Sequence, residues 1–167
     1  MTAEEVQYAL TYSQHSPFYI RSHYVVPNVS WGLGFNHELD LLSISKEGRI
    51  GTEIEIKVSK SDLKKDLEKL HGHYDARIRL LYFAGPIELE KAFFEFAPPK
   101  AGIITISHYP ERPNHKYQCV IRRKPKLGKW GTTGYKFTDK EIMQLLHLGN
   151  MRYWSQFHKQ FKSKKGE

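Results

Sequence analysis

The chain has 167 residues, enough for one domain with a single core, and its 40% hydrophobic and 13% aromatic residues are typical of a folded globule rather than a disordered chain. Lys and Arg outnumber Asp and Glu by 26 to 18, and the formal charge of +8 favours a polyanionic partner, with nucleic acid as the first candidate. Cys119 is the only cysteine, which excludes an intramolecular disulfide and a thiolate zinc cluster, and the chain has neither a signal peptide nor a long apolar segment, so we expect a cytoplasmic protein without membrane contact.

The first half of the chain predicts a helix followed by β-structure. Thr2 is a candidate N-cap for a helix over 3–13, in which Glu4 and Glu5 occupy the first turn. Strict alternation of Ile54, Ile56 and Val58 with charged residues indicates a strand. The expected strands cover about 24–26, 38–45 and 50–59, with a turn at 46–49 between the last two.

The second half predicts alternating helices and strands. A basic helix over 62–71 is followed by a strand over 78–84, a helix near 88–96, strands over 102–107 and 117–122, and a long helix that begins at Thr138. We therefore expect an α/β three-layer sandwich in which helices flank a central mixed sheet. The whole chain, 1–167, is expected to be a single domain with a basic tail at about 162–167.

The hairpin of the second and third strands brings charged residues together. A two-residue turn at Glu47 and Gly48 places Asp40 opposite Glu55, and the same register places Glu38 opposite Lys57. Opposed carboxylates repel each other unless a cation neutralises them. Magnesium takes one or two carboxylates together with water and phosphate oxygens, so Asp40 and Glu55 are candidate ligands and magnesium should raise the melting temperature.

A cation beside Lys57 suits phosphodiester cleavage. This reaction needs an activated water and neutralisation of the charge that develops on the phosphate. The metal supplies the water activation, and the Lys57 ammonium can orient that water or stabilise the developing charge. A mixed-charge, solvated strand face is the alternative, but Leu42 and Ile44 on the charged side indicate that this face is covered.

These residues resemble the PD-(D/E)XK nuclease superfamily, in particular its small standalone branch, which is described as DNA-repair-associated and phage-borne. The resemblance lies in the segment Glu38–Leu42, in Glu55-Ile56-Lys57 and in the following small residue, Asp62-Leu63 and Asp66. It continues more weakly through 82–84, 101–104 and 148–154.

The resemblance implies a restriction-endonuclease-like fold and a DNA endonuclease that depends on Mg²⁺ or Mn²⁺. It implies that Asp40, Glu55 and the Ile56 backbone carbonyl bind the metal and that Lys57 is catalytic, with Glu5 as the metal-associated glutamate of the first helix and Glu4 as its rival. Many members carry a basic residue where this chain has Glu38, so Glu38 can instead join the metal shell or pair with Lys57, and Glu53 is a further candidate ligand.

Basic residues beside this hairpin and near the C-terminal loop are candidates for nucleic-acid contacts. They are Lys60, Lys64, Arg122, Arg123, Lys124, Lys126 and Lys129. The expected partner is DNA, and RNA is also compatible with these contacts. Because cutting both strands of a duplex usually needs two active sites, a homodimer is compatible with this function.

Other features give weaker signals. His71 and His73 form a His-x-His pair, but two imidazoles without a nearby carboxylate indicate zinc only weakly, and the nine histidines are expected at the surface. The aromatic residues of the last helix are spaced as a core face. A nucleic-acid-binding accessory module without turnover is the alternative to the nuclease.

Overall fold

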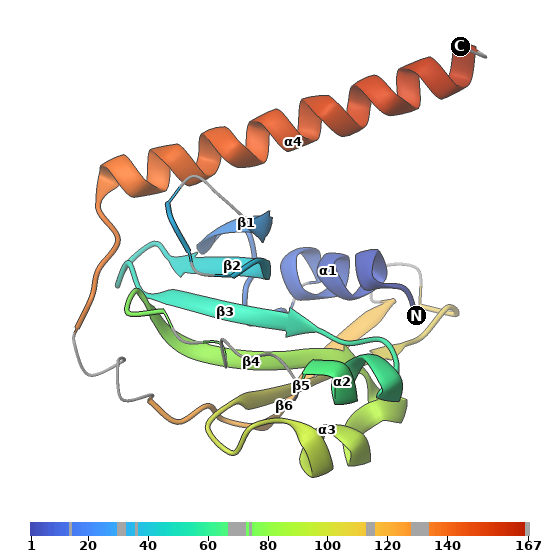
Figure 1. Cartoon of the computed structure of the whole chain (residues 1–167). Coiled ribbons are helices and arrows are strands. Elements are labelled where there is room, and N and C mark those ends of the chain that lie inside the picture. The colour runs from blue at the N-terminus through green and yellow to red at the C-terminus, as the bar shows by residue number, and fades with distance from the viewer. Residues whose placement is uncertain are drawn as a thin grey trace.

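The computed structural model describes residues 1–13, 15–29, 33–35, 37–66, 73, 75–112, 116–127 and 134–165, with the backbone alone for 163–165. At the centre of these residues lies a mixed sheet whose six strands follow one another in chain order (Figure 1). The strands are β1 (His23–Val29), β2 (Leu39–Ser45), β3 (Gly51–Ile56), β4 (Ile78–Pro86), β5 (Gly102–His108) and β6 (Tyr117–Arg123). β1 and β3 are both antiparallel to β2, which lies between them, β4 and β5 run parallel to β3, and β6 is antiparallel to β5.

Helices cover both faces of this sheet, which makes the chain an α/β protein with a mixed open sheet. The helices are α1 (Ala3–Tyr12), α2 (Lys60–Asp66), α3 (Glu90–Phe96) and α4 (Asp139–Lys165), and the short 3-10 helix η1 (Ile87–Leu89) precedes α3. The connection through α2 carries the chain from β3 to the parallel strand β4, as a parallel pair requires. None of the described helices combines the length and the apolar composition needed to cross a bilayer.

Local sequence signals account for where the first and last helices begin. Thr2 and Glu5 form a reciprocal capping box at the start of α1, which confirms Thr2 as the N-cap. Thr138 and Glu141 make the same pair of contacts at the start of α4. β1 runs past the predicted end at Val26 and through Pro27, which is tolerated because β1 is an edge strand.

The two sheet faces are packed differently. On one face, α1 packs on a single apolar cluster that contains Leu41, Ile54 and Ile56. On the other face, one cluster gathers Leu42 and Ile44 under α4, and a separate cluster gathers side chains of β4 and β5 under α2 and α3. The strand β3 lies between these two clusters and presents its charged residues there. Leu39 packs with Leu42 and Ile44 rather than with Leu41.

The predicted register of the β2–β3 hairpin is confirmed, although the turn is not the one expected. Leu42 pairs with Glu53 and Leu41 with Ile54, as the sequence indicated. The strands are joined by a longer turn than the two-residue one expected. The last hydrogen bond before the turn runs from the Ser45 amide to the carbonyl of Ile50, and Arg49, within the turn, adopts a positive φ of 53°. Loops of two and of four residues centred on the same position give the same register, so the side-chain pairing survives the error in the turn.

The aromatic residues of α4 are not core residues, contrary to the sequence-based expectation. The first part of the helix packs on the sheet through Ile142, Leu145 and Leu148, but the rest extends past the sheet (Figure 1). The aromatic side chains of this extension are about half exposed, and they are Tyr153, Trp154, Phe157 and Phe161. Helical spacing alone predicted a shared face correctly but not that the sheet ends before it reaches that face.

Candidate active site

A charged row on β3 separates the two apolar clusters on the face covered by α4, α2 and α3. Glu53 and Glu55 are almost completely buried, and Lys57 follows directly after the strand with only 4% exposure. The predicted strand reaches 59, but β3 ends at Ile56, and the Lys57 amide still donates to the carbonyl of Ala84 at 3.0 Å. Charges buried to this extent are costly unless they are paired, so their partners determine what the row can do.

Lys57 is the cation of this row. Its Nζ lies 2.8 Å from Glu55 Oε2, 3.0 Å from Asp66 Oδ1 and 4.0 Å from Asp40 Oδ2. Burial on its own lowers the pKa of this ammonium, but the charges and hydrogen bonds of Glu55 and Asp66 outweigh burial and raise the pKa above its usual value. Lys57 is therefore a positive charge at the end of β3 in the absence of metal.

Asp40 is the solvent-exposed member of the same group. Its Oδ2 accepts a 2.8 Å hydrogen bond from the Ile56 amide, and its side chain is 37% exposed, whereas Glu55 and Lys57 are buried. The side chains of Asp40 and Glu55 come from neighbouring strands and reach one ammonium. Carboxylate oxygens are the ligands that Mg²⁺ and Mn²⁺ prefer, so Asp40, Glu55 and the Ile56 carbonyl have the chemistry expected of such a site.

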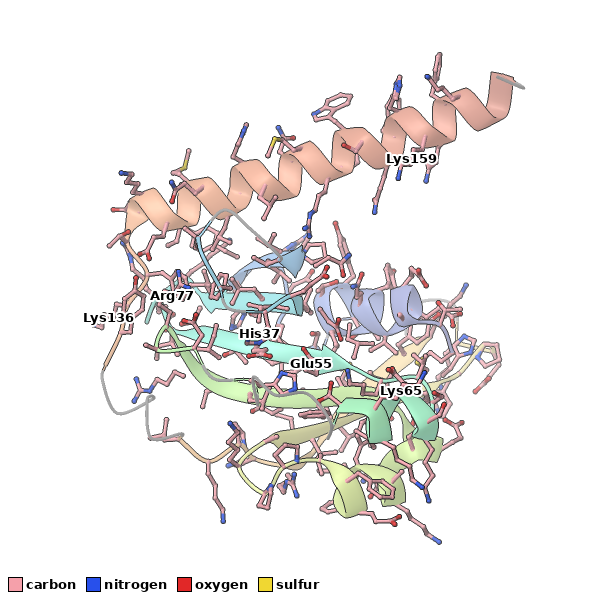
Figure 2. The ribbon with its side chains drawn as sticks, viewed as in Figure 1. His37, Glu55, Lys65, Arg77, Lys136 and Lys159 are labelled. Atoms are coloured by element: carbon pink, nitrogen blue, oxygen red, sulfur yellow. The ribbon has the colours of Figure 1, made fainter. Side chains whose placement is uncertain are left out.

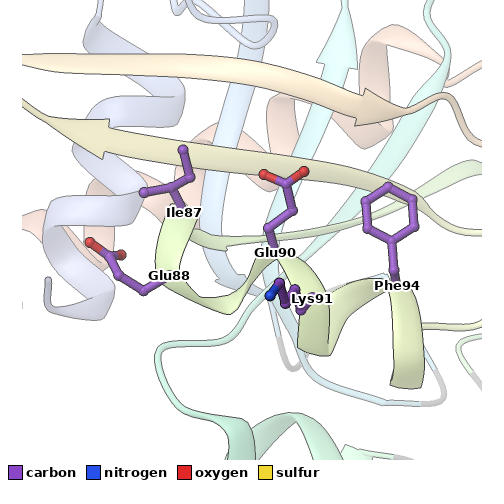
Figure 3. Close-up of a pocket in the computed structure, with 5 residues that line it drawn as sticks. All are labelled: Ile87, Glu88, Glu90, Lys91 and Phe94. Carbon is purple, nitrogen blue, oxygen red and sulfur yellow. The ribbon is translucent and has the colours of Figure 1, made fainter.

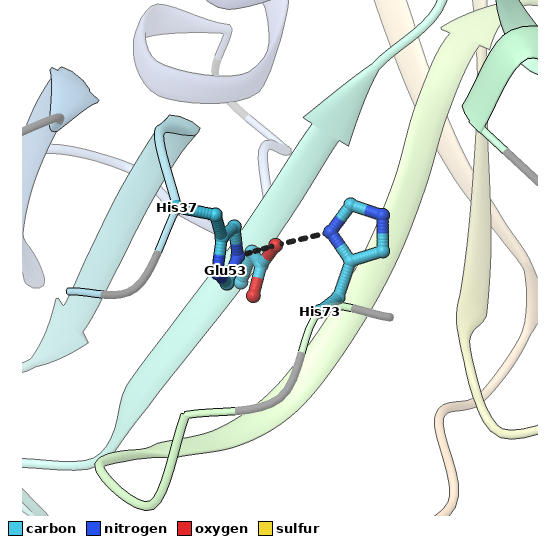
Figure 4. Close-up of side chains that lie close together, drawn as sticks. All are labelled: His37, Glu53 and His73. Carbon is cyan, nitrogen blue, oxygen red and sulfur yellow. Dashed lines mark hydrogen bonds and ion pairs between the residues drawn. The ribbon is translucent and has the colours of Figure 1, made fainter. Parts of the chain in front are cut away.

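Two buried histidines extend the cluster beyond the residues predicted from sequence (Figure 4). His37 Nε2 lies 2.9 Å and His73 Nδ1 2.7 Å from Glu53 Oε1, and His73 Nε2 lies 2.7 Å from Asp66 Oδ2. These two histidines are at most 9% exposed, so the expectation that the histidines lie at the surface is wrong for them. The sequence carried two signals for this group, the His-x-His pair and the second aspartate of the motif, but no signal for His37.

The protonation of His73 follows from its two partners. A neutral imidazole has one N–H, whereas both ring nitrogens of His73 face carboxylate oxygens. Burial lowers the pKa of the ring, but the hydrogen bonds and charges of Asp66 and Glu53 outweigh burial and raise it to about 9. Burial raises the pKa of Glu53, yet hydrogen bonds from His37 and His73 lower it overall. The metal-free cluster thus holds itself together by ion pairs.

A pH titration of stability tests this protonation state. Because the folded-state pKa of His73, about 9, lies above its ordinary value of 6.5, its contribution is fully present below pH 6.5 and is lost as the pH rises to about 9. In EDTA we expect the free energy of unfolding to fall by about 3 kcal/mol over this window. Urea titrations at several pH values measure it, and His73→Gln should show a much smaller fall. A wild-type stability that stays level would contradict a charged His73.

Two other predicted metal-associated carboxylates, Glu5 and Glu38, make no described contact with this group. Glu5 caps α1, and its other oxygen accepts from the Tyr117 hydroxyl at 3.3 Å, so its described hydrogen bonds are to Thr2 and Tyr117. Glu38 is exposed, and among the described residues Lys57 makes its ion pairs with Glu55, Asp66 and Asp40 rather than with Glu38.

The lysines of α2 lie close to the site in the chain and are accessible. Lys60 and Lys64 are exposed, and both ammonium groups stand 5.2 Å from the centre of the Phe96 ring. Lys60 also pairs with Glu95 at 3.4 Å. Figure 2 shows Lys65 on α2 and Glu55 on the adjoining strand β3. The helix therefore presents basic side chains at the end of the sheet where Lys57 lies.

The basic residues near β6 lie three strands from β3. Arg122 contacts Glu90 and Thr105, and Arg123 donates to the carbonyls of Ala101 and Pro98, so both guanidinium groups have partners within the protein. Lys124 and Lys126 are exposed, and Lys129 lies outside the described residues. The predicted nucleic-acid contacts therefore fall into two separate regions, of which only the α2 region adjoins Lys57.

A surface pocket beside α3 is a separate feature (Figure 3). Its lining residues are Ile87, Glu88, Glu90, Lys91 and Phe94. None of them belongs to the charged cluster, and two carboxylates against one lysine do not favour a phosphate ligand.

Comparisons with protein-family models, with curated proteins and with solved structures found no match for this chain.

Proposed function

We propose that this chain is a Mg²⁺- or Mn²⁺-dependent endonuclease that hydrolyses DNA phosphodiester bonds on a restriction-endonuclease-like fold, with a role in DNA repair, recombination or phage DNA processing. The observation that carries the proposal is the meeting of Asp40 and Glu55, from neighbouring strands, at the buried ammonium of Lys57. The order of a helix, an antiparallel meander, a crossover and a parallel strand supports the fold assignment.

Asp40, Glu55 and the Ile56 carbonyl are the residues that would hold the metal. A bound ion would supply a water of lowered pKa and would polarise the scissile phosphate. The Ile56 amide donates a hydrogen bond to Asp40 and orients its carboxylate. This bond fixes the Asp40 ligand relative to the Ile56 residue that carries the carbonyl ligand. Its partial exposure gives a phosphate oxygen a route to this edge of the cluster.

Lys57 acts by charge rather than as a base. Glu55 and Asp66 raise its pKa, so in the absence of metal Lys57 is an ammonium that can stabilise developing negative charge. A positive group held in place where negative charge develops lowers the barrier without reorganisation. Glu55 and Asp66 position that ammonium, and the exposed lysines of α2 attract the polyanionic backbone.

A cleavage assay tests the proposal. Labelled DNA as single strand, duplex, flap and junction, together with RNA, is incubated with Mg²⁺ or Mn²⁺ and the wild-type chain, Asp40→Asn, Glu55→Gln or Lys57→Met. We expect the wild type to cleave at least one DNA substrate and each variant to lose about 100-fold or more of that rate. Glu47→Gln, an exposed carboxylate in the turn at the opposite end of the hairpin, is the matched control and should keep full activity.

Two outcomes would contradict different parts of the proposal. Absence of cleavage by the wild type, with DNA binding retained in all three variants, would favour the non-catalytic binding module. Cleavage that persists in Glu55→Gln would leave the activity standing and refute the assignment of the site. Far-UV circular dichroism of each variant excludes loss of fold as the cause.

A further inference from the structure

Three metal-ligating side chains from distant parts of the chain meet behind the proposed active site. His37 comes from the segment before β2, Glu53 from β3, and His73 from the connection between α2 and β4 (Figure 4). One ligand atom of each lies within 4.8 Å of the others, and all three side chains are buried. The two imidazole rings stand nearly perpendicular, with their centroids 5.5 Å apart.

Hydrogen bonding does not account for the whole arrangement. Both histidines direct a nitrogen at the same oxygen, Glu53 Oε1, at 2.9 and 2.7 Å. The second oxygen, Glu53 Oε2, is buried and has no hydrogen-bond partner among the described residues. A buried carboxylate oxygen in this state is costly, and a bound ion or water is one of its few physical explanations.

The contact between Asp66 and His73 is the one expected behind a metal ligand. A metal-bound histidine nearly always donates its other ring N–H to a carboxylate, which orients the ring and makes the ligand more basic. His73 Nε2 meets Asp66 Oδ2 at 2.7 Å, and this leaves Nδ1 directed at Glu53 and His37. Asp66 is in turn held by Lys57 at 3.0 Å. The contacts from Lys57 to Asp66 and from Asp66 to His73 thus fix the orientation of the His73 ring.

The neighbouring set of Glu55, Asp66 and His73 also brings ligand atoms together, but it is the poorer cation site. Lys57 Nζ lies 2.8 Å from Glu55 and 3.0 Å from Asp66, so two of the three ligands of this set are already paired with the ammonium, and the set offers one imidazole where the Glu53 set offers two. The set built on Glu53 has two imidazoles and no lysine contact among the described residues. Two nitrogens and a carboxylate suit zinc and related first-row ions better than magnesium.

We propose that His37 Nε2, His73 Nδ1 and the Glu53 carboxylate bind one zinc-class divalent ion, with Asp66 orienting His73. The ion replaces the Nδ1 proton of His73, which passes to solvent. The ligand atoms need to move apart by roughly 0.4 to 0.8 Å, since zinc holds nitrogen and oxygen at about 2.0–2.2 Å in a tetrahedral shell and so separates them by roughly 3.3–3.5 Å. A water or Glu53 Oε2 completes the shell. The ion joins three segments and is structural, and it is separate from the magnesium site proposed above.

Metal binding to the full chain tests this directly. Protein stripped with EDTA is dialysed against limiting Zn²⁺ and its metal content is measured, and Co²⁺ is titrated as a spectroscopic probe. We expect one zinc per chain, a zinc-dependent rise in Tm, and a cobalt d–d spectrum of low symmetry. His37→Gln and Glu53→Gln should lose stoichiometric binding and the Tm shift. Asp66→Asn should weaken binding by about 10- to 100-fold.

Two controls separate this site from the proposed nuclease and from general histidine binding. His147→Gln, an exposed histidine on α4, should bind zinc as the wild type does. Asp40→Asn should lose cleavage and keep zinc. Failure of the wild type to bind zinc, or unchanged binding in both His37→Gln and Glu53→Gln, would overturn the proposal. Absence of cleavage by a zinc-loaded wild type would count against the nuclease alone.

Discussion

Lys57→Met should lower the free energy of unfolding of the metal-free protein by about 3 to 5 kcal/mol, the usual cost of removing one partner of a buried ion pair. The ammonium contacts Glu55 and Asp66 directly, and both carboxylates are buried. Methionine has a similar length, so the packing changes little while the charge disappears. Urea titration at pH 7 in EDTA measures the loss.

The control for this charge removal is an exposed lysine of the adjoining helix. Lys60 pairs with Glu95, and both side chains are more than half exposed, so Lys60→Met should change stability by less than about 1 kcal/mol. Divalent metal should restore part of the stability of Lys57→Met, because an ion held by carboxylates replaces the missing charge. A loss below about 1 kcal/mol for Lys57→Met would show that the cluster does not depend on this ammonium.

Gly85→Ala should destabilise the protein by more than about 3 kcal/mol, at the upper end of the range for overpacking. A Cβ at this position of β4 would overlap the main-chain carbonyl oxygen of Lys57 and lie 2.9 Å from Cζ of the buried Phe93 ring. A backbone carbonyl cannot turn away as a side chain does, so β4 must separate from the end of β3. Thermal and urea unfolding measure the loss of stability.

This substitution has a matched control in the same chain. Gly149 lies inside α4, and a Cβ there would meet Val26 Cγ1 at an ordinary 3.7 Å. Gly149→Ala should therefore raise the free energy of unfolding by about 0.5 to 1 kcal/mol, through the better helix propensity of alanine. If Gly85→Ala proved as stable as the wild type, the close approach of β4 to Lys57 would be refuted.

The positions of the predicted site residues depend mostly on features that are local in the sequence. Period-two alternation identified β3, and the centre of the turn decided which residues of β2 lie opposite those of β3. Asp40 and Glu55 therefore came out as neighbours from chain order alone. The sequence led us to expect that these two carboxylates repel each other without metal. It did not show that the Lys57 ammonium lies close to both and offsets this repulsion.

By itself, the sequence determined the order and nature of the helices and strands, the hairpin register and the charged row on β3, because these depend on spacing and on residues close in the chain. Only the tertiary structure decided that His37 and His73 meet at Glu53, that Asp66 reaches Lys57, and that the aromatic face of α4 is exposed. Such contacts join segments far apart along the chain, and their closeness depends on where helices end and how connections cross the sheet. The periodicity of a single segment carries no information about either.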